Sequence, residues 1–362
     1  MKIKDICTFV TDGSHNPPQG IEKSEYMMLS SKNVFDDEIT FDEPRFLSEK
    51  DFEREHMRTK IAVGDVLLTI VGTVGRAATV GEEMPAFALQ RSVAVLHPKS
   101  DVCLPRFLMY ALRGKRTYIE NRAKGVAQKG IYLKEVSAIN IHIPDISNQE
   151  IIINKLDKVN TIIKLRQEEL LALDTLIKAR FVEMFGDMVT NPNGWKKVLL
   201  GEACDVRDGT HDSPQYYSEG YPLVTSKNVT GGKIDFTDCS LICKEDYNKI
   251  NQRSKVDYGD ILMPMIGTVG NPVIVDIDGE FAIKNVALIK FRDNSAVINS
   301  FVKTLLESDY FDRAVISKVR GGTQKFISLG DIRKLEICLP PISVQNQFAD
   351  FVHQVDKSKV VW

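Results

Sequence analysis

Two apolar runs of the same form lie in the two halves of this chain. Residues 66–71 are apolar apart from Thr69, and Gly72-Thr73-Val74-Gly75 follows them directly. Residues 261–266 are also nearly all apolar, and residues 267–270 repeat the glycine-bounded segment. A short continuous apolar run is typical of a buried strand, and the glycines allow a tight turn after it. The pattern predicts a buried strand and a turn in each half.

Each half also contains a short run with helical spacing. Pro105 can occupy the first position of a helix, where its missing amide is no loss, and Ser300 is a candidate N-cap for the second run. The apolar positions that share one predicted helix face are Phe107, Leu108, Ala111 and Leu112, and then Phe301, Val302, Leu305 and Leu306.

Between the halves the apolar period becomes that of a coiled coil. From residue 148 to about residue 185, apolar positions follow steps of four and three, and no proline or glycine interrupts them. Ser147 with Glu150 predicts a capping box, and Gly186 marks the end. Such a helix would be roughly 57 Å long. The apolar seam consists of Ile152, Leu156, Val159, Ile163, Leu170, Leu173, Ile177 and Met184, with Arg166 and Arg180 at two of its positions.

A seam of this kind implies a partner helix. The chain repeats it after Ser343, at Phe348, Val352 and Val355, for about half the first length. We therefore expect an antiparallel coiled coil with a truncated second helix. We also expect that truncation to leave the stretch from Leu170 to Met184 uncovered, and so to weaken assembly with partners or favour self-association.

Polar motifs recur in the same order about 195 residues apart, which indicates a duplicated domain. The pairs are Asp12-Gly13-Ser14-His15 with Asp208-Gly209-Thr210-His211, Ser31-Lys32-Asn33-Val34 with Ser226-Lys227-Asn228-Val229, Gly64-Asp65-Val66-Leu67 with Gly259-Asp260-Ile261-Leu262, Phe87-Ala88-Leu89 with Phe281-Ala282-Ile283, Gln128-Lys129 with Gln324-Lys325, and Ile143-Pro144, Ser147 and Gln149 with Leu339-Pro340, Ser343 and Gln345. The predicted fold class is α+β. Two mixed domains, residues 1–146 and 189–342, are joined by a long helix at 147–188 and followed by a short helix at 343–362.

Composition limits the possible classes of protein. With 362 residues, 43% apolar and 27% charged, the chain is long enough for two ordinary domains. Membrane-length apolar runs and a signal-like N-terminus are lacking, so we expect a cytoplasmic protein. The six cysteines lack the spacing of a metal site and are interpreted as free thiols. A net charge of −2 still permits a local basic face.

Candidate catalytic motifs are weak. Asn16-Pro17-Pro18 is similar to the Asn-Pro-Pro-aromatic motif of amino-methyltransferases, but Gln19 replaces the aromatic residue and the second half lacks the motif. The Gly-Thr-Val-Gly segment has neither the lysine of a P-loop nor the third glycine of a dinucleotide fingerprint. His15 and His211 occupy equivalent loops without a recurring nucleophile. We therefore predict neither a catalytic nor a metal site.

Basic residues point instead to nucleic acid. A stretch from Arg106 to Lys134 is rich in arginine and lysine, and a weaker version surrounds residues 313–325. Such residues supply sequence-independent phosphate affinity, while Asn, Gln, Arg and Lys can read base edges. The predicted DNA contacts are His15, Lys32, Asn33, Thr73, Arg76, Gln90, Arg91, Arg122, Lys124, Gln128 and Lys129 in the first half, and His211, Lys227, Asn228, Thr268, Asn271, Lys284, Asn285, Arg320, Gln324 and Lys325 in the second.

Taken together, the duplicated motifs and the two seam helices resemble the specificity (S) subunit of type I restriction-modification systems over essentially the whole chain. The resemblance implies a non-catalytic DNA-reading subunit whose two domains each bind half of a bipartite site on double-stranded DNA. It implies two modification subunits that methylate adenine with S-adenosylmethionine, and restriction subunits that use ATP and Mg. The two conserved helices would fix the spacing of the half-sites, near 34 Å for one turn of DNA.

Two other functions stay open. The chain could be a silent or truncated form that binds DNA without partners, or a stand-alone methyltransferase. The first should bind a defined DNA site alone, and the second should bind S-adenosylmethionine. Differences between the copies, such as Arg76 against Asn271 and Arg91 against Asn285, predict half-sites of different sequence.

Overall fold

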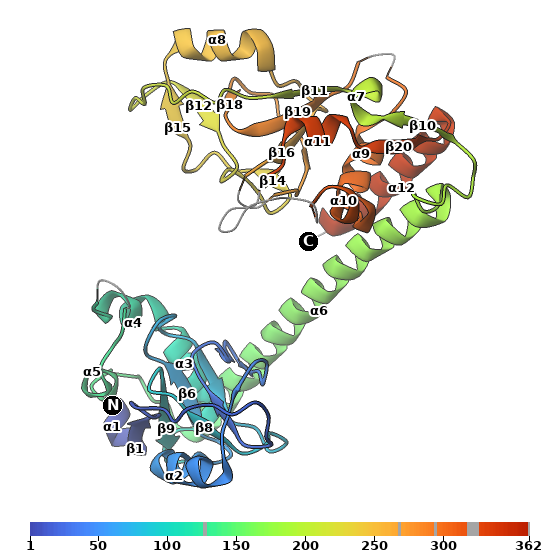
Figure 1. Ribbon diagram of the computed structural model, residues 1–362. Helices are drawn as coiled ribbons and strands as arrows, with labels where there is room; N and C mark the ends of the chain where they lie inside the picture. The colour runs from blue at the N-terminus through green and yellow to red at the C-terminus, as the bar shows by residue number, and fades with distance from the viewer. Residues whose placement is uncertain (126–128, 267–268, 293–294, 317–325, 361–362) are drawn as a thin grey trace. The chain divides into compact units, whose positions relative to one another are not determined.

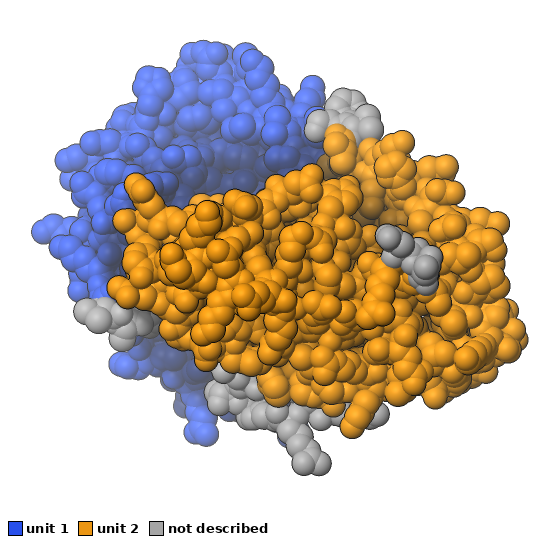
Figure 2. Space-filling view, turned by 90° about the horizontal axis from the view of Figure 1, so that it is seen from above, with its two compact units in different colours: residues 1–165 blue, residues 166–362 orange. Residues whose placement is uncertain are grey.

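The computed structural model describes residues 1–125, 129–266, 269–292, 295–316 and 326–360. It divides into two compact units, residues 1–165 and 166–362 (Figure 1 and Figure 2). The division falls inside one long helix, so each unit carries part of that helix. We describe each unit by itself.

The first unit combines two small sheets with helices. Its elements are α1 (Ile3–Ile6), β1 (Cys7–Asp12), β2 (Met27–Leu29), β3 (Val34–Phe35), β4 (Glu38–Ile39), β5 (Arg45–Phe46), α2 (Glu49–Thr59), β6 (Val66–Thr69), β7 (Ala77–Thr79), β8 (Phe87–Leu89), β9 (Val93–Pro98), α3 (Pro105–Arg113), α4 (Arg116–Arg122), α5 (Leu133–Ser137) and the beginning of α6 (Ile146–Phe185). One sheet has the antiparallel order β1-β9-β6-β7, and the other has the order β5-β2-β8 with β2 and β8 parallel. The hairpin β3-β4 completes the unit.

Strand β6 is buried on both faces, which explains its continuous apolar sequence. Val66 and Leu68 join the core cluster that contains the α3 side chains, whereas Leu67 joins the cluster on the opposite face. Alternate side chains of a strand point to opposite faces, so both faces need apolar residues here. The predicted strand and turn are confirmed, since Gly72 and Gly75 adopt φ of 83° and 93°.

The second unit repeats this topology. Its elements after α6 are β10 (Lys196–Leu199), α7 (Leu200–Ala203), β11 (Asp205–Asp208), β12 (Tyr221–Val224), β13 (Val229–Thr230), β14 (Lys233–Ile234), β15 (Ser240–Ile242), α8 (Lys244–Ser254), β16 (Ile261–Pro264), β17 (Val273–Ile274), β18 (Ala282–Ile283), β19 (Val286–Lys290), α9 (Asn299–Leu306), α10 (Asp309–Ala314), α11 (Leu329–Arg333), β20 (Glu336–Leu339) and α12 (Ile342–Val360). The sheets β11-β19-β16-β17 and β15-β12-β18 match those of the first unit strand for strand. The predicted duplication and α+β class are confirmed.

The end of α6 and the helix α12 pack antiparallel within the second unit. Phe348, early in α12, contacts Phe181 and Phe185 near the end of α6, with ring centroids 5.5 Å and 5.3 Å away. Lys359, late in α12, has its Nζ 2.7 Å from the Asp174 carboxylate, and its carbonyl oxygen accepts a hydrogen bond from Arg166 (2.7 Å). The predicted antiparallel pair is confirmed.

The uncovered part of the seam lies opposite to our expectation. An antiparallel α12 reaches the end of α6 first, so Leu170, Leu173, Ile177 and Met184 are half-buried, and the last two pack against the core. The early seam is exposed instead. Ile152 is 36%, Val159 51% and Ile163 49% exposed.

Two predicted helix caps are wrong. Helix α6 begins at Ile146, and the Asp145 carboxylate accepts the amide of Asn148 (2.9 Å), so Asp145 caps it in place of Ser147. Helix α9 begins at Asn299 after Ile298, which places Ser300 inside the helix. In each case the helix begins before the residue that was expected to cap it. Pro105 does open α3, as predicted.

Candidate nucleic-acid interface

The Asp-Gly-Ser/Thr-His loop is pinned to the strand beside it in both units. A Cβ atom on Gly13 would lie 2.1 Å from the Leu89 carbonyl oxygen, and one on Gly209 would lie 2.1 Å from that of Ile283. Only glycine permits this approach. The next amide donates to the same oxygen, from Ser14 at 2.7 Å and from Thr210 at 2.9 Å. The loop thereby places a histidine beside the residues that follow β8 or β18.

In the first unit, one aspartate contacts both a histidine and an arginine. Asp12 is buried at the end of β1. Its Oδ2 lies 2.8 Å from His15 Nε2, and its Oδ1 accepts from Arg58 Nη2 at 3.4 Å. Arg58 comes from α2, 46 residues away in the sequence, and our sequence analysis missed it.

The second unit repeats the arrangement. Asp208 Oδ2 lies 2.7 Å from His211 Nε2, while Arg253 of α8 donates to Asp208 Oδ1. His211 Nδ1 also lies 2.8 Å from the Asn285 amide oxygen. The contacts with Asn285 and Asp208 raise the pKa of His211. Arg253 follows its aspartate by 45 residues, so its repeat position was the signal that could have revealed both arginines.

Other predicted residues of the first unit lie along the same edge. The Arg91 amide donates to the Ser14 carbonyl oxygen, and Gln90 pairs with Ser14 in a bridge. Next to Arg91, Ser92 Oγ accepts the amide of Ser31, which precedes the exposed Lys32. These backbone contacts bring His15, Lys32, Gln90 and Arg91 together.

The turn at residues 72–75 connects this edge of the sheet to the basic stretch between Arg106 and Lys134. The Ser92 carbonyl oxygen accepts the amides of Ile70 and Val71, and Gly72 donates to the Lys129 carbonyl oxygen (2.9 Å). Lys124 and Lys129 are exposed, and the backbones of Lys124 and Gly130 exchange two hydrogen bonds. The remaining predicted residues here are Thr73, exposed in the turn, Arg76, stacked 4.8 Å over the Phe35 ring, and Arg122, stacked 4.5 Å over the Tyr118 ring.

The second unit presents its predicted residues around an open hollow. Lys227, Asn228, Lys284 and Asn285 line it, and Tyr216 lies at its wall. A neighbouring hollow is lined by residues that include His211, Lys249 and Arg253. Asn271 is exposed with a φ of 53°. The predicted contacts Gln128, Thr268, Arg320, Gln324 and Lys325 lie outside the described residues.

The two repeated asparagines hold loops. Asn33 and Asn228 are buried, at 4% and 7% exposure. The Asn33 amide group donates to the Asp42 carbonyl oxygen and accepts from the Ser30 amide, and Asn228 makes the same pair of contacts with Asp235 and Thr225. Backbone groups thus occupy the side-chain amides of both residues.

The Gly-Asp-Val/Ile-Leu motif is explained by the contacts of its buried carboxylate. Asp65 lies 2.6 Å from His97 Nδ1, and Asp260 lies 2.5 Å from Lys290 Nζ. Each carboxylate also accepts the amide three residues earlier, at 2.7 Å and 2.8 Å. Burial raises the pKa of Asp260. The motif shapes the turn before the strand.

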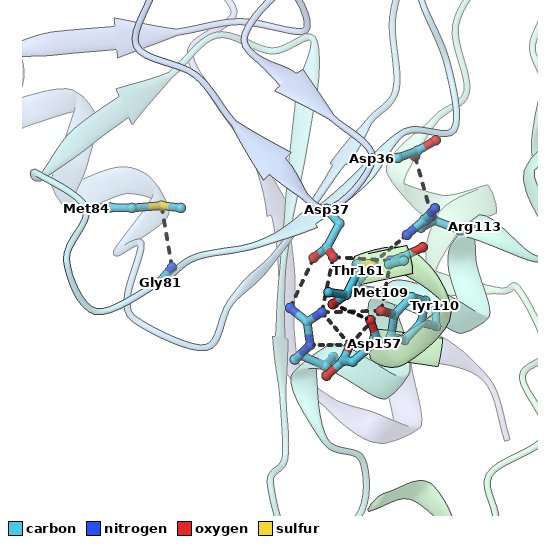
Figure 3. Close-up of polar contacts among 11 residues, drawn as sticks. Asp36, Asp37, Gly81, Met84, Met109, Tyr110, Arg113, Asp157 and Thr161 are labelled. Atoms are coloured by element: carbon cyan, nitrogen blue, oxygen red, sulfur yellow. Dashed lines mark hydrogen bonds and ion pairs between the residues drawn. The ribbon is translucent and has the colours of Figure 1, made fainter. Parts of the chain in front are cut away.

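Part of the basic stretch is used within the protein. Arg106 makes a bidentate contact with Asp37 (both 3.1 Å) and reaches Asp157 on α6. Tyr110 also donates to Asp157 (2.6 Å), and burial raises the pKa of Tyr110 to about 12. Figure 3 shows Asp37, Tyr110 and Asp157 converging, with Asp36 toward Arg113 nearby. Arg113 and Arg116 pair with Asp36, at 3.9 Å and 2.7 Å.

A repeated glutamine joins each helix to its domain. Gln149 is fully buried, donates to the Val102 and Pro144 carbonyl oxygens, and accepts the Leu104 amide at 2.8 Å. Gln345 makes the equivalent three contacts with Ala296, Pro340 and Ile298. The repeated Pro-x-x-x-x-Gln pattern therefore fixes the angle at which α6 and α12 leave their domains.

The fold and this interface define a class: a duplicated recognition protein, each copy of which presents a basic, hydrogen-bonding edge beside a docked helix. The family model of the type I restriction modification DNA specificity domain matches residues 1–174 and 192–360. The chain belongs to this family of DNA specificity domains.

Relatives agree over most of the chain. The specificity subunit of the type I restriction enzyme MjaVIII of Methanocaldococcus jannaschii is 24% identical over 287 residues, covering 74% of this chain and 67% of the relative. The putative MjaX specificity subunit of that organism is 23% identical, covering 98% and 86%. A crystal structure of the type I S subunit from M. genitalium matches with a TM-score of 0.52 and 15% identity, covering 99% and 89%. That similarity supports the fold.

Within the described part of the chain, every helix is too short or too polar to cross a membrane.

Proposed function

We propose that this chain reads a bipartite site on double-stranded DNA, one half-site per unit, for a type I restriction-modification complex. The observation that carries the proposal is the recurrence of the same loop, strand end and His-Asp-Arg cluster in both units, with different side chains at matching positions. Arg91 in the first unit corresponds to Asn285 in the second, and Gln90 corresponds to Lys284. Arginine, asparagine and glutamine prefer different base edges, so the half-sites differ in sequence.

The chemistry belongs to the partners in this proposal. Two modification subunits methylate adenine with bound S-adenosylmethionine, and restriction subunits use ATP and Mg to cleave DNA in the cytoplasm. This chain selects the site. The same interface would serve a stand-alone DNA-binding protein, so the experiment has to detect the product of the partners.

The exposed early seam of α6 supports docking of the modification subunits. Ile152, Val159 and Ile163 form an apolar stripe that solvent reaches, and such stripes mark interaction surfaces. We expect the isolated chain to self-associate through this stripe and modification subunits to suppress that association. Light scattering on both samples tests this; a strictly monomeric isolated chain that binds its partners at full strength would contradict it.

The first test of the proposed function is single-molecule sequencing of adenine methylation in host DNA, with and without this gene and with the modification gene intact. We expect one two-part methylated motif to disappear with the gene. Arg91→Ala should relax only one half of that motif, and Lys284→Ala should relax only the other. No change in methylation would contradict the proposal. Calorimetry with S-adenosylmethionine on the isolated chain separates the alternative, because only a stand-alone methyltransferase would bind it.

A further inference from the structure

In each unit, an arginine from a helix remote in the sequence reaches the Asp-Gly-Ser/Thr-His loop. Both arginines are accessible to solvent. The side chains of Arg58 and Arg253 are 43% and 63% exposed, although each contacts an aspartate that is mostly shielded. Arg253 also donates to the Gly209 carbonyl oxygen (3.3 Å), the glycine that fixes the loop. The helix end and the loop are therefore held as one surface in the second unit.

The shared aspartate divides its two oxygens between the arginine and the histidine. A guanidinium carries five N–H donors, and in both units these contacts are made by Nη2 alone, which leaves donors on the other nitrogens for a further acceptor. The aspartate fixes the direction of the side chain and thereby removes part of the entropy cost of binding an anion. A phosphate oxygen is the acceptor that matches such a planar, oriented donor set on DNA.

Residues of the candidate interface border the same cluster of aspartate, histidine and arginine. In the first unit the Asp12 loop contacts the strand end that carries Gln90 and Arg91. In the second, Arg253 and Lys249 line one hollow together with His211. Groups suited to phosphate thus lie next to groups suited to base edges, as DNA interfaces require.

We propose, on the basis of the function proposed above, that Arg58 and Arg253 each contact a phosphate of the DNA backbone at corresponding positions of the two half-sites, and that Asp12 and Asp208 orient them. The contacts set the register of each unit on DNA and carry no sequence information themselves.

The test measures how the dissociation constant for DNA depends on salt. The probe is a fluorescent duplex that carries the motif found by methylation sequencing, and the protein is the full chain in complex with its modification subunits. Each phosphate contact contributes about one unit to the slope of log affinity against log salt. We expect Arg58→Gln and Arg253→Gln each to lower the slope by about 1 and affinity by roughly tenfold. Arg58→Lys and Arg253→Lys should retain the slope.

Matched controls come from the same regions. Arg54 lies one turn before Arg58 on α2 and pairs with Asp51 (3.0 Å) and Glu55 (3.1 Å). Arg292 follows β19 at the end opposite Asn285 and is 81% exposed. Gln at either position should leave the slope unchanged.

The possible results separate the two proposals. If Arg58→Gln and Arg253→Gln weaken binding or lower the melting temperature while the slope stays at the wild-type value, the arginines only tie helix to strand and this inference is wrong. If the wild-type complex shows no affinity for the duplex, the proposed function fails with it.

Discussion

The joints between domain and helix differ in the two units, although the buried glutamine at the center of each joint is the same. In the first unit, Arg106, Tyr110 and Asp157 form a polar network around the joint. The repeat-equivalent positions in the second unit are Ser300, Thr304 and His353, and there the joint is aromatic. Its members are Phe181, Phe185, Phe301 and Phe348.

The difference follows from what covers each helix. The beginning of α12 is covered by the end of α6, so an aromatic cluster can exclude water there. The beginning of α6 carries Ile152 at the position of Phe348, and Ile152 is 36% exposed while Phe348 is fully buried. A joint that remains open to solvent is better held by charged hydrogen bonds than by aromatic rings. The buried glutamine is thus the same in both units, whereas the residues around it differ according to whether a second helix covers the joint.

The largest expected effect concerns the aromatic joint. Phe348→Ala removes a ring packed on Phe181 and Phe185 and leaves a cavity, so it should lower the free energy of unfolding by about 3–5 kcal/mol. Trp195 contacts Phe185, with centroids 6.0 Å apart, and reports on this region by fluorescence. Urea denaturation in a Trp362→Phe background, where Trp195 is the sole tryptophan, measures the loss.

Ile152→Ala is the matched control in the first unit. Its partial exposure limits the expected loss to roughly 1 kcal/mol or less, measured by circular dichroism of the full chain. Equal losses for the two variants would show that the early seam of α6 is also covered, and would remove the contrast between the joints.

Much of the fold could be predicted from the sequence because it depends on local periodicity and on repetition. The buried strand β6, the helix α3 and the long helix α6 each follow from apolar spacing. The elements of the second unit could then be predicted from those of the first, because the motifs recur in the same order. The antiparallel direction of α12 was predicted correctly, but the end of α6 that stays uncovered was predicted wrongly. Helix α12 begins beside the end of α6, where Phe348 packs on Phe181 and Phe185, and this starting point depends on tertiary packing and not on the seam sequence.

The interface was predicted less completely because its key contacts cross long sequence separations. His15 was predicted from a repeated motif and Arg91 from its position just after one, whereas Arg58 lies in a helix whose sequence has no motif. Asn33 was predicted as a DNA contact because asparagine reads adenine, but its amide holds the loop at Asp42. A repeated polar residue can hold a turn, pair with a charged residue or contact a ligand. Burial distinguishes a residue that holds a turn from one that contacts a ligand.

A smaller effect is expected at the polar joint. Asp157→Asn weakens hydrogen bonds from Arg106 and Tyr110, and should cost about 1 kcal/mol once partial exposure is taken into account. Burial opposes the charged form of Asp157, but the bonds from Arg106 and Tyr110 outweigh it and lower the pKa of the carboxyl group. This stabilisation is therefore present above the ordinary value of 3.8 and is lost as pH falls through the lower folded value.

The salt dependence of unfolding sharpens this comparison of joints. The loss caused by Asp157→Asn should shrink when the ionic strength is raised, because salt screens the partly exposed Arg106 pair. The loss caused by Phe348→Ala should not shrink with salt. A salt-independent loss for Asp157→Asn would mean that the polar joint acts through packing.

The smallest effect concerns pH at the two recognition loops. In the second unit both nitrogens of His211 face acceptor oxygens, of Asn285 and Asp208, which favours the protonated ring and raises its pKa. Arg253 opposes protonation, and Asp246 and Lys249 of α8 and the adjacent Asp212 line the same hollow. In the first unit the residue at the position of Asn285 is Arg91, a permanent cation.

A raised folded pKa means that the stabilisation is complete below the ordinary value of 6.5 and is lost as pH rises through the folded value. In the proposed DNA complex, the positive charge of His211 is lost over the same range. Affinity for a duplex in which only the second unit's half-site is intact should therefore fall modestly, about twofold to threefold, as pH rises from acid through neutrality. His211→Gln should abolish the dependence, and Asn285→Arg should weaken it by giving the second loop the permanent charge of the first. If the dependence survived His211→Gln, another group would carry it, and the two loops would not differ in the source of their charge.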